Sequence, residues 1–171
     1  MAVGVILGMM AFALLAAVAL SPDLRRVEIG GDAPDFEAVN VVTGDTVGID
    51  AFEGEVILLN IWATWCAPCE AEMPSMQRLF DELGPDGLRV VTVSIDTGDP
   101  DKVREWIDER ELTFTVLHDR TGDIEQLYQT TGVPESFIID RHGVIMKKII
   151  GATEWDHPTQ GALFRRLLAG E

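Results

Sequence analysis

Apolar residues gather in a few dense runs along this chain. Residues 1–20 are almost entirely apolar and carry no charged side chain. Two later runs, 56–62 and 88–95, are rich in β-branched residues and short enough for buried strands. These two runs predict the centre of a sheet, and the polar segments between them leave room for helices and turns.

The remaining pattern predicts strands and helices in alternation. Asp99 and Pro100 are typical of a helix start, because aspartate caps the free N–H groups and proline fits the first turn. The expected strands are 36–42, 46–49, 113–117, 136–140 and 144–150, and the expected helices are 70–83, 99–110, 121–128 and 159–169. This order predicts an α/β layer fold with a mixed central sheet flanked by helices.

The apolar residues 1–20 are close to the length that spans a bilayer as a helix. A cleaved signal peptide is one alternative, with Ala17-Val18-Ala19 as a small-x-small site, although a basic start is missing. A buried core helix is another. Arg25 and Arg26 oppose an anchor whose domain lies outside, because positive residues tend to stay in the cytoplasm. We expect a membrane anchor or signal segment at 1–20, a tether at 21–32 and one domain at 33–171.

Composition narrows the class of protein. The chain has 171 residues and a net charge of −16, so nucleic acid is an unsuitable partner, since its phosphates would be repelled. Only Lys102, Lys147 and Lys148 are lysines. The acidity fits a solubilising surface, with adaptation to salt as the alternative.

Both cysteines lie in one short motif, Trp65-Cys66-Ala67-Pro68-Cys69, where a predicted strand turns into a predicted helix. The free N–H groups and the dipole of a helix start favour a thiolate, which is the nucleophile in disulfide exchange. A structural disulfide would usually close a longer loop. A zinc site would need four ligands, but the sequence offers no second cysteine pair and no histidine pair at ligand spacing. The motif therefore predicts redox chemistry.

Four segments together resemble the membrane-anchored thioredoxin-like proteins of the TlpA, ResA and DsbE (CcmG) type. They are Gly-Asp-Ala-Pro-Asp-Phe at 31–36, Leu-Asn-Ile-Trp-Ala-Thr-Trp-Cys-Ala-Pro-Cys at 59–69, Glu-Met-Pro at 72–74 and Gly-Val-Pro-Glu-Ser-Phe at 132–137. The resemblance implies a thioredoxin-like fold with an N-terminal β-hairpin at 36–49 and an inserted helix-strand unit at 99–117. It also implies a thiol-disulfide oxidoreductase.

The resemblance assigns roles residue by residue. Cys66 is expected to be the exposed, attacking thiol, and Cys69 to resolve the mixed disulfide. Val133 and Pro134 match the cis-proline loop of the family, where a client could pair as an extra strand; a plain turn before a strand is the alternative. The residues expected to bind the client are Trp65, Pro68, Val133 and Pro134. The redox-active disulfide Cys66–Cys69 takes the place of a cofactor, and no metal is expected.

Glu72 is a further catalytic candidate. Classical thioredoxins carry a buried aspartate on the central strand, and the matching residue here, Asn60, cannot take a proton. The ResA-like branch instead has a glutamate three residues after the second cysteine, and Glu72 matches it. A carboxylate there could take the proton of Cys69. The alternative is a solvated helix glutamate like Glu70.

Local charge predicts the direction of electron flow. Glu70 and Glu72 flank the pair and no cationic residue does, which raises the thiol pKa and favours a reductant. The resemblance implies work outside the cytoplasm on clients such as apocytochrome c, with electrons from a transmembrane carrier of the DsbD or CcdA type. A thiol peroxidase and a copper-handling protein using His142 are the alternatives. Against the peroxidase, Ala63 stands where its pattern wants threonine.

Overall fold

The computed structural model describes residues 2–20 and 27–170, with some side chains of the N-terminal helix left out. The helices are α1 (Ala2–Leu20), α2 (Ala67–Leu83), α3 (Pro100–Asp108), α4 (Asp123–Leu127) and α5 (Pro158–Ala169), with 3-10 turns at η2 (Ile49–Phe52) and η3 (Gly84–Asp86). The strands are β1 (Glu37–Asn40), β2 (Thr46–Gly48), β3 (Val56–Trp62), β4 (Leu88–Ser94), β5 (Thr115–His118), β6 (Glu135–Ile139) and β7 (Ile145–Ile150).

The strands form one mixed sheet of seven, in the order β2-β1-β5-β4-β3-β6-β7. Strands β3, β4 and β5 run parallel, and β1 and β6 join their outer sides antiparallel. The fold is thioredoxin-like, as expected. The β1–β2 hairpin and the α3–β5 unit occupy the places predicted for the two additions, since both extend the sheet beyond β4.

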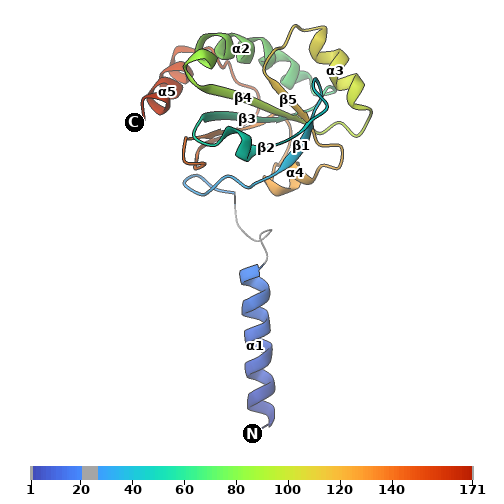
Figure 1. Cartoon of the computed structure of the whole chain (residues 1–171), viewed down its shortest axis with the longest axis vertical. Coiled ribbons are helices and arrows are strands. Elements are labelled where there is room, and N and C mark those ends of the chain that lie inside the picture. Colours follow the sequence, from blue (N-terminus) through green and yellow to red (C-terminus); the bar gives the residue numbers. More distant parts are fainter. Residues whose placement is uncertain (1, 21–26, 171) are drawn as a thin grey trace.

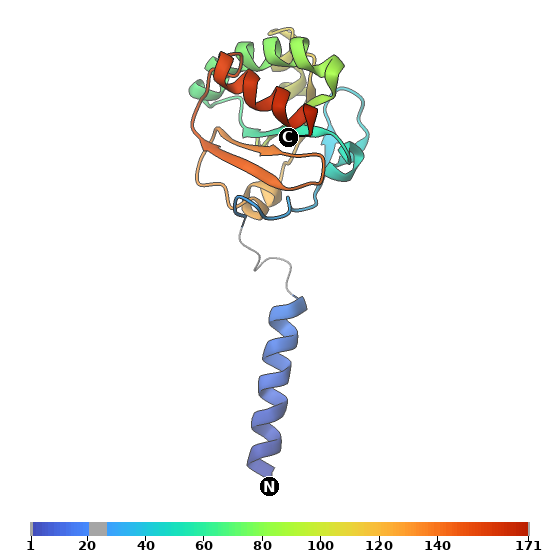
Figure 2. The ribbon, with the colours of Figure 1, turned by 90° about the vertical axis from the view of Figure 1, so that its left-hand side faces the viewer.

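Each face of the sheet carries its own apolar core, because alternate residues of a strand point to opposite faces. One face packs against helices α2, α3 and α5 through residues such as Met76, Val103 and Phe164. The other face packs against α4 and the N-terminal segment through Phe36, Ile124 and others. Figures 1 and 2 show this layering, with α2, α3 and α5 on one side of the sheet and α4 on the other.

Several predicted boundaries are wrong by a few residues. Strand β3 has the predicted bounds, whereas α2 begins at Ala67 rather than 70, because Cys66 caps it and Pro68 fits its first turn. The expected strand 46–49 ends at Gly48, since Ile49 starts a 3-10 turn. The strand at 36–42 shortens to 37–40, the helix at 121–128 to 123–127, and the strand at 113–117 moves to 115–118.

The N-terminal segment is helical over Ala2–Leu20, and nearly all of its described apolar side chains are exposed, among them Phe12 and Leu15. Among the helices whose side chains the structure describes, none is long and apolar enough to cross a membrane. Residues 21–26 of the expected tether, which include Arg25 and Arg26, lie outside the described part. Within 27–32 the chain already joins the sheet, because Gly30 N donates to Ile145 O at 2.8 Å.

Candidate active site

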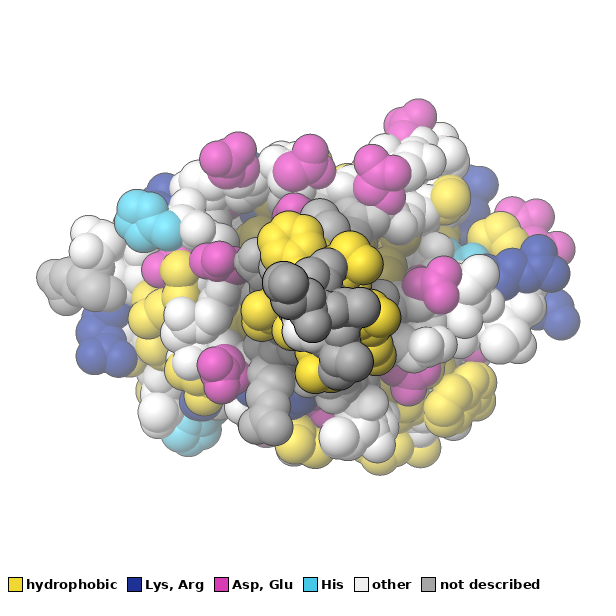
Figure 3. Space-filling view, turned by 90° about the horizontal axis from the view of Figure 1, so that it is seen from below, with side chains coloured by type: hydrophobic (Ala, Val, Ile, Leu, Met, Phe, Trp, Pro, Cys, Tyr) yellow, Lys and Arg dark blue, Asp and Glu magenta, His cyan; other side chains and the backbone are white. Residues whose placement is uncertain are grey.

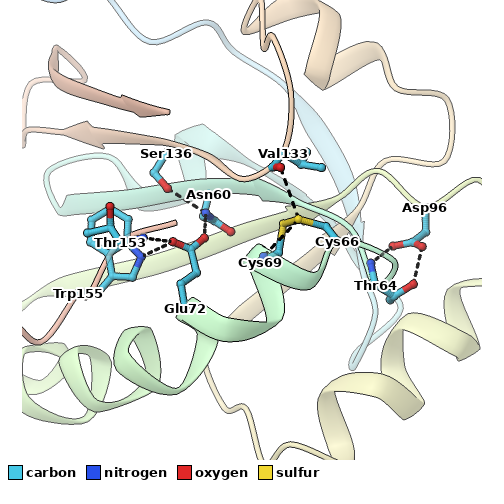
Figure 4. Close-up of a disulfide and its surroundings, with 10 residues drawn as sticks. All are labelled: Asn60, Thr64, Cys66, Cys69, Glu72, Asp96, Val133, Ser136, Thr153 and Trp155. Carbon is cyan, nitrogen blue, oxygen red and sulfur yellow. Dashed lines mark hydrogen bonds between the residues drawn. A yellow bond between two sulfur atoms is a disulfide. The ribbon is translucent and has the colours of Figure 1, made fainter. Parts of the chain in front are cut away.

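The two cysteines lie at the junction of β3 and α2 and form a disulfide with an S–S distance of 2.06 Å (Figure 4). Cys66 is the N-cap of α2, and its Sγ accepts the backbone N–H of Cys69 at 3.2 Å. A thiolate at Cys66 would receive the same hydrogen bond and the favourable helix dipole. The local sequence thus places Cys66 where a negative sulfur is stabilised.

The two sulfurs differ in accessibility. Cys69 is fully buried, whereas Cys66 keeps 5% of its surface. Cys66 is the more exposed of the two cysteines, as the predicted roles require, but it is less exposed than predicted. Trp65 and Pro68, expected to bind the client, are both exposed beside it, Trp65 to 68%. A client can therefore approach only the Cys66 side of the disulfide.

The Val133–Pro134 loop faces the disulfide, and the bond between the two residues is cis. The carbonyl oxygen of Val133 lies 3.4 Å from Cys66 Sγ, as Figure 4 shows. Val133 is half-buried and Pro134 is buried. The loop is thus part of the site rather than a turn remote from it, which places all four expected client-binding residues next to Cys66.

Glu72 is buried one turn after Cys69, on the same face of α2. Its Oε2 accepts Thr153 N and Trp155 Nε1, each at 3.0 Å, and its Oε1 accepts Asn60 Nδ2 at 2.9 Å. The alternative of a solvated glutamate is wrong. Burial raises the pKa of the Glu72 carboxyl, although these three donors oppose the rise.

Asp96 holds the loop before Cys66 and was missed at the sequence level. Its carboxylate accepts the N–H of Thr64 at 2.9 Å and the hydroxyls of Thr64 and Ser94 at 2.7 Å each. Asp96 follows the end of β4, the parallel neighbour of β3. Because parallel strands end at one edge of the sheet, that adjacency was the available signal.

The charge at Glu70 differs from the sequence-based expectation. Arg110, which follows α3, donates to Glu70 Oε1 at 2.7 Å. The assumption that no cation lies near the motif is therefore wrong, because Arg110 is remote in sequence but adjacent in space. Among the described residues, however, no cationic side chain is hydrogen-bonded to either sulfur; outside the disulfide, the polar contacts of Cys66 Sγ are with backbone groups.

His142 lies far from the cysteines. It lines a pocket with Gly54 and Ile57, at the start of β3, whereas Cys66 follows the end of that strand. Strand β3 separates the two by roughly 20 Å, from about 3.3 Å per residue. The structure therefore does not bring His142 to a copper site at the cysteines. No group of three or more metal-ligating side chains lies together in the described ranges 2–20 and 27–170.

This arrangement can carry out dithiol-disulfide exchange. It combines a capped, partly accessible sulfur, a buried second sulfur and a buried carboxylate on the same helix. The Val133 carbonyl beside Cys66 offers a backbone acceptor to a bound segment. The unequal burial of the two sulfurs fits the expected attack at Cys66 and resolution by Cys69.

Comparison with known proteins points to the same chemistry. Residues 29–148 match the AhpC/TSA family. The chain is 39% identical over 140 residues to the thiol-disulfide oxidoreductase ResA of Oceanobacillus iheyensis. The aligned part covers 80% of this chain and 72% of that protein. It is 36% identical over 127 residues to the thioredoxin-like protein YneN of Bacillus subtilis, covering 73% of each.

A solved structure agrees at the level of fold. The DsbE-type thiol:disulfide interchange protein of Chlorobium tepidum superposes with a TM-score of 0.71 at 28% identity. The superposition covers 84% of this chain and 97% of that one.

Proposed function

Because this chain belongs to the AhpC/TSA family and is a thiol-disulfide oxidoreductase of the ResA/DsbE type, we propose that it reduces protein disulfides outside the cytoplasm. The observation that carries the proposal is the unequal pair of sulfurs at the start of α2. Cys66 keeps 5% of its surface exposed beside the Val133 carbonyl, whereas Cys69 is fully buried.

The reaction uses two exchanges. The Cys66 thiolate attacks a client disulfide and forms a Cys66–client bond, while the other client sulfur leaves as a thiolate and takes a proton from solvent. Cys69 then loses its proton and attacks Cys66 Sγ. The Cys66–Cys69 disulfide forms, the Cys66–client bond breaks, and the client has gained two electrons. Glu72 is the proposed acceptor of the Cys69 proton, since its carboxylate is buried one turn away.

The surroundings of the sulfurs support the direction of transfer. A strong oxidant stabilises its thiolate and therefore its reduced form. Here the described polar contacts of Cys66 Sγ outside the disulfide are one backbone N–H and one backbone carbonyl, and Arg110 is paired with Glu70. Glu72 adds a carboxylate on the side of Cys69. The start of α2 thus stabilises the Cys66 thiolate without help from a cationic side chain. Less stabilisation than in a strong oxidant favours donation of electrons.

The proposal extends to partners and place. A reductant in an oxidising compartment serves clients that must stay reduced, such as the CxxCH pair of apocytochrome c. The electrons would come from a transmembrane carrier of the DsbD or CcdA type. The uncharged apolar residues 1–20 would keep the domain at the membrane, or direct its export if they are cleaved.

A peroxidase is the weaker candidate. The residue three positions before Cys66 is Ala63, which is fully buried and has no hydroxyl, and the nearby Thr64 hydroxyl is engaged by Asp96. Consumption of hydrogen peroxide by the reduced protein measures this activity directly. Turnover that requires Cys66 and exceeds client reduction would favour the peroxidase.

The reduction potential tests the proposed direction. The full-length protein is equilibrated in thiol buffers, and the exposed Trp65 beside Cys66 reports the change by fluorescence. We expect a value near or below about −230 mV, in the range of reducing thioredoxin-like proteins. A value near about −120 mV, as in a strong oxidant, would contradict the proposal. In the supporting case, Cys69→Ser is expected to accumulate the client mixed disulfide and Cys66→Ser is not.

A further inference from the structure

Asn60 is a fully buried amide, and one of its two polar atoms has no partner. Its Nδ2 donates to Glu72 Oε1 at 2.9 Å and to Ser136 Oγ at 2.8 Å. Its Oδ1 accepts no hydrogen bond from any residue that the structure describes. Such orphaned buried acceptors are rare in folded proteins, so the surroundings of this oxygen need a chemical explanation.

The position of Asn60 explains what the oxygen faces. Leu58 and Trp62, its neighbours at alternate positions of β3, belong to the core that contains both cysteines. By strand alternation, Asn60 points to the same face, beneath α2. In Figure 4 the amide nitrogen points toward Glu72 and Ser136, and the amide oxygen points toward the disulfide. The orphaned acceptor is therefore directed at the redox pair.

Reduction supplies the missing donor. In the disulfide neither sulfur carries a hydrogen, whereas a reduced Cys69 carries an S–H in a fully buried place. We propose that Asn60 is a positioning residue, whose Oδ1 accepts the Cys69 S–H in the reduced protein, so that one amide links this thiol to the Glu72 carboxylate. The inference rests on the proposed redox cycle and adds a residue to it.

The link has a consequence for proton transfer. With Glu72 ionised, the amide holds Cys69 as a thiol. With Glu72 protonated, its O–H needs an acceptor. If the Asn60 side-chain amide flips so that its O and N exchange places, Oδ1 accepts from Glu72 and NH2 donates to a Cys69 thiolate. The Ser136 hydroxyl suits both orientations, because it donates and accepts. Asn60 thus favours states in which one proton is shared between Cys69 and Glu72.

This pairing fits the resolving step. The proton that leaves Cys69 ends on Glu72, the Cys69 thiolate attacks Cys66 Sγ, and the client sulfur departs with the bonding electrons. The Glu72 proton is then released to solvent. In the next reduction a donor thiolate attacks Cys66 Sγ, and Cys69 Sγ leaves as a thiolate and takes up a proton from solvent. Asn60 gains and loses no proton overall. Its role is to position the Cys69 thiol and the Glu72 carboxyl through hydrogen bonds to one amide.

The test measures the pH titration of the Cys69 thiol in full-length Cys66→Ser protein by thiolate absorbance, a readout that needs no access to the buried sulfur. Asn60→Leu keeps the shape of the side chain and removes the acceptor. Losing a hydrogen bond to the neutral thiol is expected to lower the titration midpoint of Cys69 by about one pH unit, a tenfold change in the thiolate equilibrium. The shift caused by Glu72→Gln is expected to fall to about half or less in the Asn60→Leu background, because the link is gone.

A matched control is Thr92→Val. Thr92 is fully buried on β4 and pairs with Asn60 across the sheet, but its hydroxyl contacts Thr115 O rather than the network. We expect it to leave the midpoint in place. A merely structural role of Asn60 would change the unfolding midpoint and leave both the titration midpoint of Cys69 and its dependence on Glu72 as in the parent protein, which would overturn the inference.

Two further measurements keep the test decisive. If Asn60→Leu does not fold, Asn60→Ala takes its place, and NMR of the otherwise unaltered chain follows the Asn60 side-chain NH2 signals. These signals are expected to move on reduction; unchanged signals would contradict the inference. The wild-type reduction potential and client reduction do not depend on these variants. The two proposals can therefore fail separately. The reduction potential can contradict the reductase function while Asn60 still shifts the Cys69 titration, and the Asn60 effect can be absent while the protein reduces its client.

Discussion

At the scale of single residues, burial gives Glu72 a role that its place on an amphipathic helix does not reveal. The carboxyl has its pKa raised by burial, so the folded protein holds this proton more tightly than the unfolded chain does. The contribution of Glu72 to stability is therefore greatest below its ordinary pKa of 4.5 and declines as the pH rises toward the folded pKa. This sign is opposite to that of a salt-bridged carboxylate.

Glu72→Gln is expected to remove this decline. Relative to wild type, the oxidised variant gains unfolding free energy as the pH rises from 4.5 through the folded pKa, because glutamine does not titrate. Urea unfolding at a series of pH values measures the difference. Glu70→Gln is the control, since Glu70 is exposed on the same helix. A difference independent of pH would contradict the raised pKa.

Asp96 provides a second residue-scale prediction. Asp96→Ala removes the acceptor of the Thr64 N–H and of two hydroxyls, and part-buried hydrogen bonds to a charged group are worth more than neutral ones. We expect a loss of about 2–3 kcal/mol in unfolding free energy. Urea denaturation measures it, with Asp101→Ala as the exposed control. Equal stabilities of the two variants would show that the contacts of Asp96 are not stabilising.

At the scale of elements, α3 packs on the core through the buried Val103 and Ile107 and through the partly buried Trp106. Its ring lies 4.8 Å from that of the buried Trp62, and the Arg110 guanidinium lies 3.9 Å from the centroid of the Trp106 ring. Arg110 in turn donates to Glu70 on α2. The segment that follows the inserted helix therefore carries the cation that compensates the charge beside the redox motif.

Trp106→Ala is expected to loosen α3 and cost about 2–4 kcal/mol, less than a fully buried tryptophan because the ring is only partly covered. Hydrogen exchange should rise in α3 more than in α2. Trp65→Ala is the matched control: its ring is exposed, so stability should hardly change while client reduction falls. Uniform loss of protection throughout the domain would contradict a local attachment.

At the scale of the whole molecule, the dominant property is the net charge of −16. Figure 3 shows acidic side chains spread over the face seen along α1 rather than gathered in one patch. A field of one sign attracts cationic clients and repels anionic ones over distances that salt shortens. Charge thus acts on how often a client meets Cys66 and not on the exchange itself.

The salt dependence of client reduction follows from this charge. Two disulfide peptides of equal length, one rich in lysine and one in glutamate, are reduced by the full-length protein at increasing NaCl. We expect kcat/KM to fall for the basic peptide and to rise for the acidic one, severalfold between about 0.01 and 0.15 M, where the Debye length shrinks from about 30 to 8 Å. Parallel slopes for the two peptides would rule out a role for the net charge.

Local pattern explains how much of the fold was predictable. The β-branched run at 56–62, the cap at Asp99 and the proline after Cys66 act through neighbours a few residues away, and the elements they predicted are present. Errors lie at element ends, where one residue such as Ile49 is decided by the turn that follows. The topology was predicted from the four segments that resemble the thioredoxin-like family, because the order of strands in a sheet cannot be inferred from hydrophobic periodicity.

The sequence by itself determined the redox motif, the helix that begins at it and the family with its thioredoxin-like fold. Only the tertiary structure decided what surrounds the sulfurs: Trp155 donates to Glu72 across 83 positions, Arg110 to Glu70 across 40, and Thr64 to Asp96 across 32. Periodicity and capping are set by residues within a turn or two of each other, whereas these contacts depend on the order and register of the strands. The charge and the proton affinity of the site depend on such contacts, and so only the tertiary structure determines them.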